Sequence, residues 1–268
     1  MRLALVHKQI GGGGGLETYV SSLASRLAAE GHKLDLVCQQ AGPEVESGSI
    51  HILPTFPVLR TQRLLRFNRD VGRKVAALGV DHVLGFGQTT HQDVHRAGGG
   101  CHAVYSRGLP PIRRLSLKNQ VELRLERELY TSGRTRHFVV NARKVADEIS
   151  AEYGVPEQRI TVIHTPVDSD RFRPVERARD ELRQSLVPGT DLSRPAFIFV
   201  SLNHKRKGLD HLLRTWSDVE AELWIVGSPL DEARLPANVH YLGRRSDLEE
   251  LLRAADCFVH PTLYDACA

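Results

Sequence analysis

The sequence predicts an α/β protein that consists of two doubly wound domains. Short apolar runs, typical of strands buried on both faces of a sheet, alternate with segments whose apolar residues recur at helical spacing. This alternation runs through residues 1–165 and starts again at residue 195. It is typical of parallel sheets covered by helices. The segment between, residues 166–194, is rich in charge, proline and turn formers, and we expect it to be an interdomain connection.

The first domain is expected to open with a strand, a helix and a second strand. Residues 2–7 predict the first strand and residues 33–38 the second. Between them, one apolar face along residues 16–30 predicts a helix that Gly31 ends. Further strands are expected at residues 50–53, 81–86, 137–140 and 160–163, and further helices at residues 59–78, 115–130 and 142–153.

The second domain is expected to be incomplete. Its strands are predicted at residues 196–201, 221–226, 239–242 and 256–260, and its helices at residues 208–216 and 247–254. So few strands and helices do not make a finished doubly wound domain. We therefore expect the chain to end within its second domain.

Composition restricts the class of function. The 268 residues carry a net charge of +4 and only 6% aromatic residues, so binding to nucleic acid is not indicated. Four cysteines are scattered without a CxxC pair, which favours free thiols in a reducing compartment. No apolar run reaches the ~18 residues of a membrane span, and the N-terminus is too short in its apolar part for a signal peptide. We expect a cytoplasmic location.

A run of five glycines, residues 11–15, follows the first strand. It matches neither the GxGxxG dinucleotide pattern nor a GK[ST] phosphate loop. The run is either a structural turn or a loop whose backbone N–H groups face a ligand. Because five glycines lose much conformational entropy on ordering, the ligand-facing loop is favoured.

A basic turn joins the first strand and the first helix of the second domain. It contains Lys205, Arg206 and Lys207 and ends at Gly208. Ligands of open parallel sheets bind where the strands end, and helix N-termini attract anions. A solvated basic loop is the alternative. The context of the whole chain favours an anion site for a diphosphate.

Cations also follow the predicted helix at residues 59–78 and recur at Arg107, Arg113, Arg114 and Lys118. Solvated faces are the simplest explanation. Apolar residues interleave with these cations, which keeps open a surface for anionic lipid headgroups or for a phosphorylated acceptor.

The histidines do not indicate a metal site. Neither His102 nor His164 belongs to an HxxxH or HExxH spacing, and no GxSxG nucleophile motif is present. A lone histidine such as His102 is more often an ordinary surface or core residue.

Several motifs together resemble the GT-B glycosyltransferases of family 4. Gly14-Gly15-Leu16-Glu17 follows the first strand, and Arg206-Lys207-Gly208 follows the first strand of the second domain. Residues 162–174, 241–256 and 260–265 extend the likeness in the family's order. The motifs are specific jointly rather than singly, and they cover nearly the whole chain.

Within the family, residues 83–86 and 93–102 are most similar to the glucosyltransferases that act on a heptose of the lipopolysaccharide core. Three positions depart from the family pattern. Gly99 stands where that subgroup often has an acidic residue, and Thr165 stands where the family has asparagine. Asp265 replaces the first of two paired glutamates, and the second would fall beyond the end of this sequence.

The resemblance implies a GT-B fold and a retaining transferase that needs no metal or other cofactor. It would move a hexose, with glucose favoured, from a nucleotide diphosphate-sugar, with a UDP-sugar favoured, to a glycan or glycolipid acceptor such as lipopolysaccharide core. Residues 1–165 would be the acceptor-side domain and residues 195–268 part of the nucleotide-sugar-binding domain. Charge grows on the departing diphosphate, so positioned cations and N–H groups should stabilise the transition state.

The resemblance also assigns roles to residues. As candidate catalytic residues, His102 would lie near the transferred sugar and Asp265 would accept hydrogen bonds from its hydroxyls. Arg206 can fork two phosphate oxygens, and Lys207 adds a point charge. The further candidates are Gly14 and Gly15 for the diphosphate, and Glu17, Asp93, Asp168 and Gly227 for the donor or acceptor cleft.

Two alternatives stay open at this point. The chain could be a non-catalytic nucleotide- or anion-binding short form of the fold, or another GT-B enzyme such as an epimerase or a phosphorylase. As a chain with an incomplete second domain, it is expected to bind donor weakly and to turn over little. Its basic segments would suit a peripheral position on the inner face of a membrane.

Overall fold

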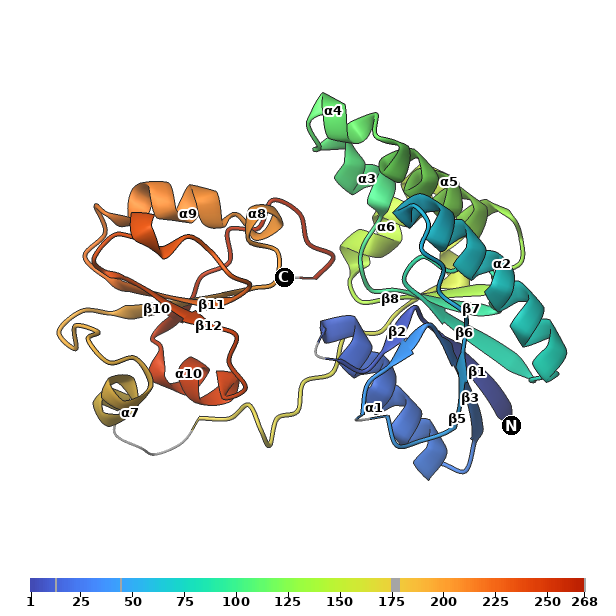
Figure 1. Ribbon diagram of the computed structural model, residues 1–268, viewed down its shortest axis with the longest axis horizontal. Coiled ribbons are helices and arrows are strands. Elements are labelled where there is room, and N and C mark those ends of the chain that lie inside the picture. Colours follow the sequence, from blue (N-terminus) through green and yellow to red (C-terminus); the bar gives the residue numbers. More distant parts are fainter. Residues whose placement is uncertain (13, 44, 175–178, 268) are drawn as a thin grey trace. The chain divides into compact units, whose positions relative to one another are not determined.

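The computed structural model describes residues 1–12, 14–43, 45–174 and 179–267. Gly13, the middle residue of the five-glycine run, therefore lies outside the described residues. The chain divides into two compact units, Met1–Thr165 and Pro166–Ala266, which we call the first and the second unit (Figure 1). Each contains a sheet of parallel strands, which confirms the predicted α/β class.

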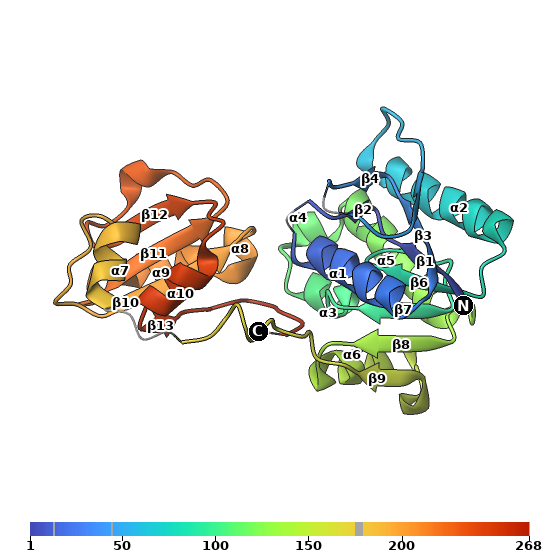
Figure 2. The ribbon, with the colours of Figure 1, turned by 90° about the horizontal axis from the view of Figure 1, so that it is seen from below.

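The first unit is built on a seven-stranded parallel sheet. Its strands lie in the order β5 (Ser49–Ile52), β3 (Lys33–Cys38), β1 (Arg2–Val6), β6 (His82–Phe86), β7 (Val94–Ala97), β8 (His137–Val140) and β9 (Ile160–Val162) (Figure 2). Its helices are α1 (Gly15–Ala29), α2 (Arg60–Leu78), α3 (His102–Arg107), α4 (Pro111–Arg114), α5 (Leu117–Thr131) and α6 (Arg143–Tyr153). Two short strands, β2 (Gln9–Ile10) and β4 (Gln40–Ala41), pair separately, and a 3-10 turn, η1 (Glu157–Arg159), precedes β9.

Alternate residues of the central strand β1 build two separate cores. Leu3 and Leu5 pack with Val20 of α1, whereas Ala4 packs with Phe67 of α2. Figure 1 shows α1 on one face of the sheet and α2, α5 and α6 on the other. The direction of strand addition reverses between β1 and β6, and ligands of such sheets bind outside the carboxyl ends of the strands at this reversal.

The second unit repeats the plan with four parallel strands. They lie in the order β12 (Val239–Gly243), β11 (Glu222–Gly227), β10 (Ala196–Ser201) and β13 (Cys257–Phe258), as Figure 2 shows. Its other elements are α7 (Arg179–Leu186), α8 (His204–Lys207), α9 (Leu209–Trp216), η2 (Glu232–Arg234) and α10 (Leu248–Ala254). The core on one face includes α7 and α10, the core on the other includes α9, and the strand order reverses between β10 and β13.

Several elements were not predicted from the sequence. Among them are β7, α3, α4 and α7. Helix α7 lies within residues 166–194, which we expected to be a connection, and its Leu182 belongs to the core of the second unit. The basic turn is itself helical: Lys205, Arg206 and Lys207 lie in α8. Among the described residues, no helix combines the length and the apolar composition that crossing a membrane requires.

Candidate active site

The loop after β1 brings Glu17 to the strand reversal of the first unit. Gly14 is the N-cap of α1, and a Cβ added to it would lie 2.0 Å from Glu17 Oε2. The carboxylate thus folds back over the bare backbone of Gly14, and Glu17 Oε1 lies 3.8 Å from His7 Nε2. The other ring nitrogen of His7 lies 3.3 Å from the carbonyl oxygen of Phe86, at the end of β6. Burial lowers the pKa of His7, although Glu17 acts in the opposite direction.

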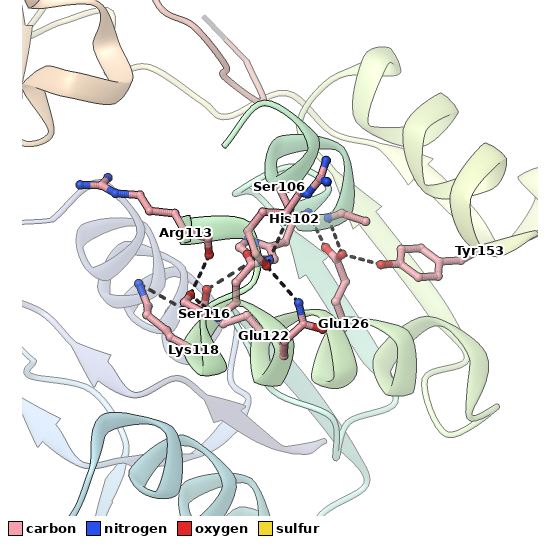
Figure 3. A network of polar contacts seen from close by, with 12 residues as sticks. His102, Ser106, Arg113, Ser116, Lys118, Glu122, Glu126 and Tyr153 are labelled. Carbon is pink, nitrogen blue, oxygen red and sulfur yellow. Dashed lines mark hydrogen bonds and ion pairs between the residues drawn. The ribbon is translucent and has the colours of Figure 1, made fainter. Parts of the chain in front are cut away.

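His102 is the first residue of α3, and a carboxylate from another helix holds its backbone. The N–H groups of His102 and Ala103 donate to the two oxygens of Glu126 at 2.5 and 2.8 Å. The hydroxyl of Tyr153 donates to the same carboxylate at 2.5 Å (Figure 3). Burial, followed by the bond to Glu126, raises the pKa of Tyr153, which therefore stays protonated. Glu126 thus fixes the start of the helix that carries His102.

A second set of bonds fixes the imidazole of His102. Its Nε2 lies 2.9 Å from Asn119 Oδ1 and 3.4 Å from Glu122 Oε2. The amide nitrogen of Asn119 donates to the Ser106 hydroxyl and to the carbonyl oxygen of Arg114. Because Asn119 uses its nitrogen as the donor, its oxygen must accept from Nε2–H of His102. In the neutral ring, Nδ1 is then the nitrogen with a lone pair.

His102 lines a pocket of about 170 Å³ at the carboxyl ends of β6 and β7. Residues 87–89 and 98–100 form part of the wall. His95 and Arg96 of β7 and Glu122 and Glu126 of α5 also line it. The pocket therefore combines the predicted His102 with polar residues that sequence reasoning did not select.

In the second unit, the structure brings Lys207 and Asp265 together. Lys207 Nζ forms an ion pair with Asp265 Oδ2 and lies 3.1 Å from His260 Nε2. His260 Nε2 is itself 3.4 Å from the carboxylate of Asp265. The side chains of Lys207 and Asp265 are 18% and 16% exposed, so solvent screens their pairing only in part. Two motifs that are far apart in sequence thus meet where the strand order reverses.

Backbone contacts hold the loop of Asp265 against the basic turn. The N–H of Leu263 donates to the carbonyl oxygen of Arg206 at 3.0 Å. Gly208 has a φ of +81°, and a Cβ added to it would lie 2.0 Å from the carbonyl oxygen of Pro261. Only a glycine combines this left-handed backbone with so close an approach.

Arg206 differs from Lys207 in that it has no anionic partner within the described part of the chain. Its Nε is buried and donates to no acceptor among the described residues. Its backbone N–H donates to the side chain of Asn203, which caps α8. A half-buried guanidinium with an unused N–H group is suited to bind a phosphate oxygen.

The remaining candidates lie elsewhere. Gly227 ends β11 at a φ of +140°, and an added Cβ would lie 1.7 Å from the carbonyl oxygen of Ser201, so it permits close packing of β11 on β10. Asp168 caps a turn by accepting the N–H groups of Asp170 and Arg171. Nothing comes within 4 Å of a Cβ added to Gly15.

Asp93 requires a correction of our expectation. It precedes β7, at the amino end of the strand, whereas His102 follows the carboxyl end. Its carboxylate accepts the backbone N–H of Val83 at 2.9 Å. Asp93 therefore stabilises the opposite edge of the sheet and is not assigned to the site of His102.

Sequence reasoning missed Arg96, Asn119, Glu126 and His260. His260 belongs to the family motif at residues 260–265, which also contains Asp265, so the motif could have indicated that the two residues lie close together. The others had no local signal, because their contacts join separate elements. No group of three or more histidine, cysteine, aspartate or glutamate side chains in the described ranges could hold a metal ion.

Comparison with known proteins gives matches along nearly the whole chain. The model of Glycosyltransferase Family 4 matches residues 13–171, and that of Glycosyl transferases group 1 matches residues 194–268. A probable transglycosylase of Burkholderia thailandensis is 27% identical over 259 residues, which cover 94% of this chain and 69% of that protein. The lipopolysaccharide glucosyltransferase WaaG of Escherichia coli is 22% identical over 273 residues, which cover 94% of this chain and 72% of WaaG.

The fold is also that of solved glycosyltransferases. The crystal structure of WaaG, described as a glycosyltransferase involved in lipopolysaccharide biosynthesis, matches with a TM-score of 0.86 at 21% sequence identity. The match covers 99% of this chain and 76% of the WaaG chain. The predicted GT-B architecture is thereby confirmed.

Proposed function

The chain belongs to glycosyltransferase family 4, and from this premise we propose that it moves a hexose from a nucleotide diphosphate-sugar to an acceptor hydroxyl. We propose glucose as the hexose, a UDP-sugar as the donor and retention of the anomeric configuration. The acceptor is a glycan or glycolipid of the kind named for WaaG, such as lipopolysaccharide core. In this proposal the reaction requires no metal.

The observation that carries the proposal is the cluster of Arg206, Lys207, Asp265 and His260. It lies at the strand reversal of the second unit, where open parallel sheets bind ligands. Arg206 would bind the diphosphate first, because no carboxylate in the described ranges pairs with it. Its N–H groups then stabilise the charge that grows on the departing diphosphate.

Lys207 and Asp265 would act as a pair. In the structure Lys207 compensates the charge of Asp265. When a diphosphate binds, Lys207 can contact both anions, and Asp265 is held ready to accept hydrogen bonds from hydroxyl groups of the sugar. Removing Lys207 would therefore leave a carboxylate unpaired beside the diphosphate, in addition to losing one cation.

In the first unit, we propose that His102 contacts the transferred sugar through the lone pair on Nδ1. Its Nε2–H is already used by Asn119, and Glu126 fixes its backbone. These bonds hold the ring before any substrate arrives, which lowers the cost of ordering it. Gly14 and Gly15 remain proposed diphosphate contacts through their backbone, with Glu17 beside them.

A cytoplasmic, peripheral position on an anionic membrane surface is also part of the proposal. Ile112, Leu115 and Leu117 are 84%, 73% and 65% exposed around the short helix α4. Arg113 and Arg114 stand among them. Apolar side chains interleaved with cations are typical of segments that lie in a lipid headgroup region.

The proposed function is tested by replacing the two cations of the site and a matched neighbour. In a protein whose second domain is complete, we expect Arg206→Ala and Lys207→Ala each to lower the rate of transfer from UDP-glucose by about 100-fold or more, as for loss of one charge-stabilising donor. Lys205 lies on the same helical turn and is exposed, so Lys205→Ala should leave the rate within about twofold. Radiolabel transfer to lipopolysaccharide core measures the rate, and calorimetry measures UDP-glucose affinity.

Near-normal rates in both Arg206→Ala and Lys207→Ala would contradict the assignment. Binding of UDP-glucose without any transfer or hydrolysis would instead favour the non-catalytic nucleotide-binding alternative. Affinity for GDP-sugars over UDP-sugars would correct the base and leave the diphosphate site in place.

A further inference from the structure

Arg96 is a buried cation without an anionic partner in the pocket that contains His102. The residue is 8% exposed, and no carboxylate in the described part of the chain pairs with it. Its two side-chain contacts are uncharged. Arg96 Nη2 donates to Thr165 Oγ1 at 2.8 Å, and its guanidinium carbon lies 3.8 Å from the centre of the Tyr19 ring. Burying a charge is costly unless the charge is compensated.

The carboxylates that line the same pocket do not compensate Arg96. Glu122 pairs with His102 and with Lys118 at 3.4 and 3.7 Å. Glu126 accepts two backbone N–H groups of α3 and the Tyr153 hydroxyl. Figure 3 shows both carboxylates turned to these partners. Each negative charge of the pocket is therefore engaged elsewhere, and the charge of Arg96 is left over.

His95, the neighbour of Arg96, adds no positive charge. Its side chain is 2% exposed, and Nδ1 has no hydrogen-bond partner in the described residues. Burial lowers the pKa of His95 to about 3, so the ring is neutral at physiological pH. Of His95 and Arg96, only Arg96 therefore contributes a positive charge to the pocket.

The chain leaves space for the guanidinium. A Cβ added to Gly98 would lie 2.1 Å from Arg96 Nη1, so any side chain there would displace the group. By contrast, nothing comes within 4 Å of a Cβ added to the adjacent Gly99. Stacking on Tyr19, the bond to Thr165 and the bare backbone at Gly98 together hold one N–H edge of Arg96 in the pocket.

We propose that Arg96 binds an oxyanion substituent, a phosphate monoester or a carboxylate, on the acceptor sugar. That this ligand is the acceptor rests on the proposed function: His102 lines the same pocket and is proposed to contact the transferred sugar, which the acceptor must approach. A planar guanidinium matches two oxygens of either group, and the bond is strengthened where water is excluded. The acceptor of this chain is accordingly an anionic sugar, and Arg96 selects it against a neutral one.

The test measures binding of three probes to the whole 268-residue chain: glucose 6-phosphate, glucuronate and glucose. The chain carries Arg206→Ala and Lys207→Ala, so that the cations of the second unit cannot bind the probe. We expect one anionic probe to bind at least about tenfold tighter than glucose by calorimetry, and Arg96→Gln to weaken it about 10- to 100-fold without changing glucose affinity. The probe that responds distinguishes phosphate from carboxylate.

A pair of alanine variants provides the matched control. Gly98→Ala should displace the guanidinium and reproduce the effect of Arg96→Gln, whereas Gly99→Ala should bind like the parent. The two glycine variants therefore test whether the Arg96 guanidinium binds the anionic probe even if Arg96→Gln fails to fold. Equal affinity for all three probes, an unchanged preference in Arg96→Gln, or identical behaviour of the two glycine variants would overturn the proposal. Absence of UDP-glucose binding to the chain with Arg206 and Lys207 intact would refute the proposed function and leave this result unaffected.

Discussion

At the scale of single residues, neighbouring hydrogen bonds decide the state of two histidines that line one pocket. His102 has its Nε2–H fixed by Asn119, and its side chain is 21% exposed. His95 is almost fully buried, and its Nδ1 has no partner among the described residues. The ring of His102 is thus held by its neighbours, whereas burial disfavours the charged form of His95.

The buried His95 predicts an acid sensitivity of the first unit. The pKa of a histidine in the unfolded chain is about 6.5, and burial lowers that of His95 to about 3. The unfolded state therefore binds the proton first, so stability falls as the pH drops below about 6.5 and continues to fall towards about 3. From pH 6.5 to 4.5, His95 should remove about 2 kcal/mol from the free energy of unfolding.

This loss is measured by urea unfolding, followed by circular dichroism, at pH 6.5 and 4.5 in the parent chain and in His95→Leu. The variant cannot take up the proton, so its loss over this range should be about 2 kcal/mol smaller. His7, whose pKa burial also lowers, is present in both proteins, and its charge adds to the burial that lowers the pKa of His95. Equal losses in the two proteins would show that His95 is not buried in its neutral form.

The site could be predicted from the sequence only where its residues stand in local patterns. The resemblance selected Lys207 and Asp265 from local motifs, and parallel topology places the strand ends before them together, but their ion pair was not predicted. Glu126 contacts His102 from 24 residues away, and neither residue type nor spacing reveals such a contact. Asp93 was assigned to the wrong edge because the strand that follows it, β7, was not recognised.

At the scale of elements, the sequence predicts those with strong apolar periodicity. Strand β10 and strand β3 begin and end where expected; β10 is an apolar run, and in β3 Leu34, Leu36 and Val37 are buried in the sheet. Strand β7 escaped recognition because two of its four residues, His95 and Arg96, are polar and yet buried. Helix α7 escaped because its eight residues include few apolar ones and its Arg183 is buried against Asp256, a tertiary contact.

The junction of α8 with the loop after β13 gives a prediction for an element. Gly208→Ala should lower the free energy of unfolding of the second unit by about 3 kcal/mol, because it combines a left-handed backbone with a collision against Pro261. The loop must move, so the affinity for UDP-glucose should fall as well. Gly243 also has a positive φ, +66°, but a Cβ there meets nothing nearer than 3.9 Å.

Gly243→Ala is therefore the matched control, with an expected cost of about 1 kcal/mol and no change in affinity. Tryptophan-detected urea unfolding measures the stability, and calorimetry measures UDP-glucose binding. If Gly208→Ala bound UDP-glucose as tightly as the parent, the loop of Asp265 would have no part in donor binding.

At the scale of the whole molecule, the cations proposed for the donor diphosphate and the cation proposed for the acceptor lie in different units. The second unit holds Arg206, Lys207 and Asp265, and the first holds His102 and Arg96. Both tryptophans of the chain, Trp216 and Trp224, are buried in the second unit. Tryptophan emission therefore follows unfolding of the second unit, whereas circular dichroism follows both.

This distribution of tryptophans makes the donor assignment testable by thermal unfolding. UDP-glucose at 100 times its Kd should stabilise the unit that binds it by about 2.7 kcal/mol. For a unit of this size the gain corresponds to about 10 °C or more in Tm. We expect the tryptophan-detected transition to rise by this amount and the remaining dichroism transition to rise less, through the proposed contacts of Gly14, Gly15 and His102. If only the dichroism transition moved, the donor would bind to the first unit alone, and the assignment of Arg206 would be wrong.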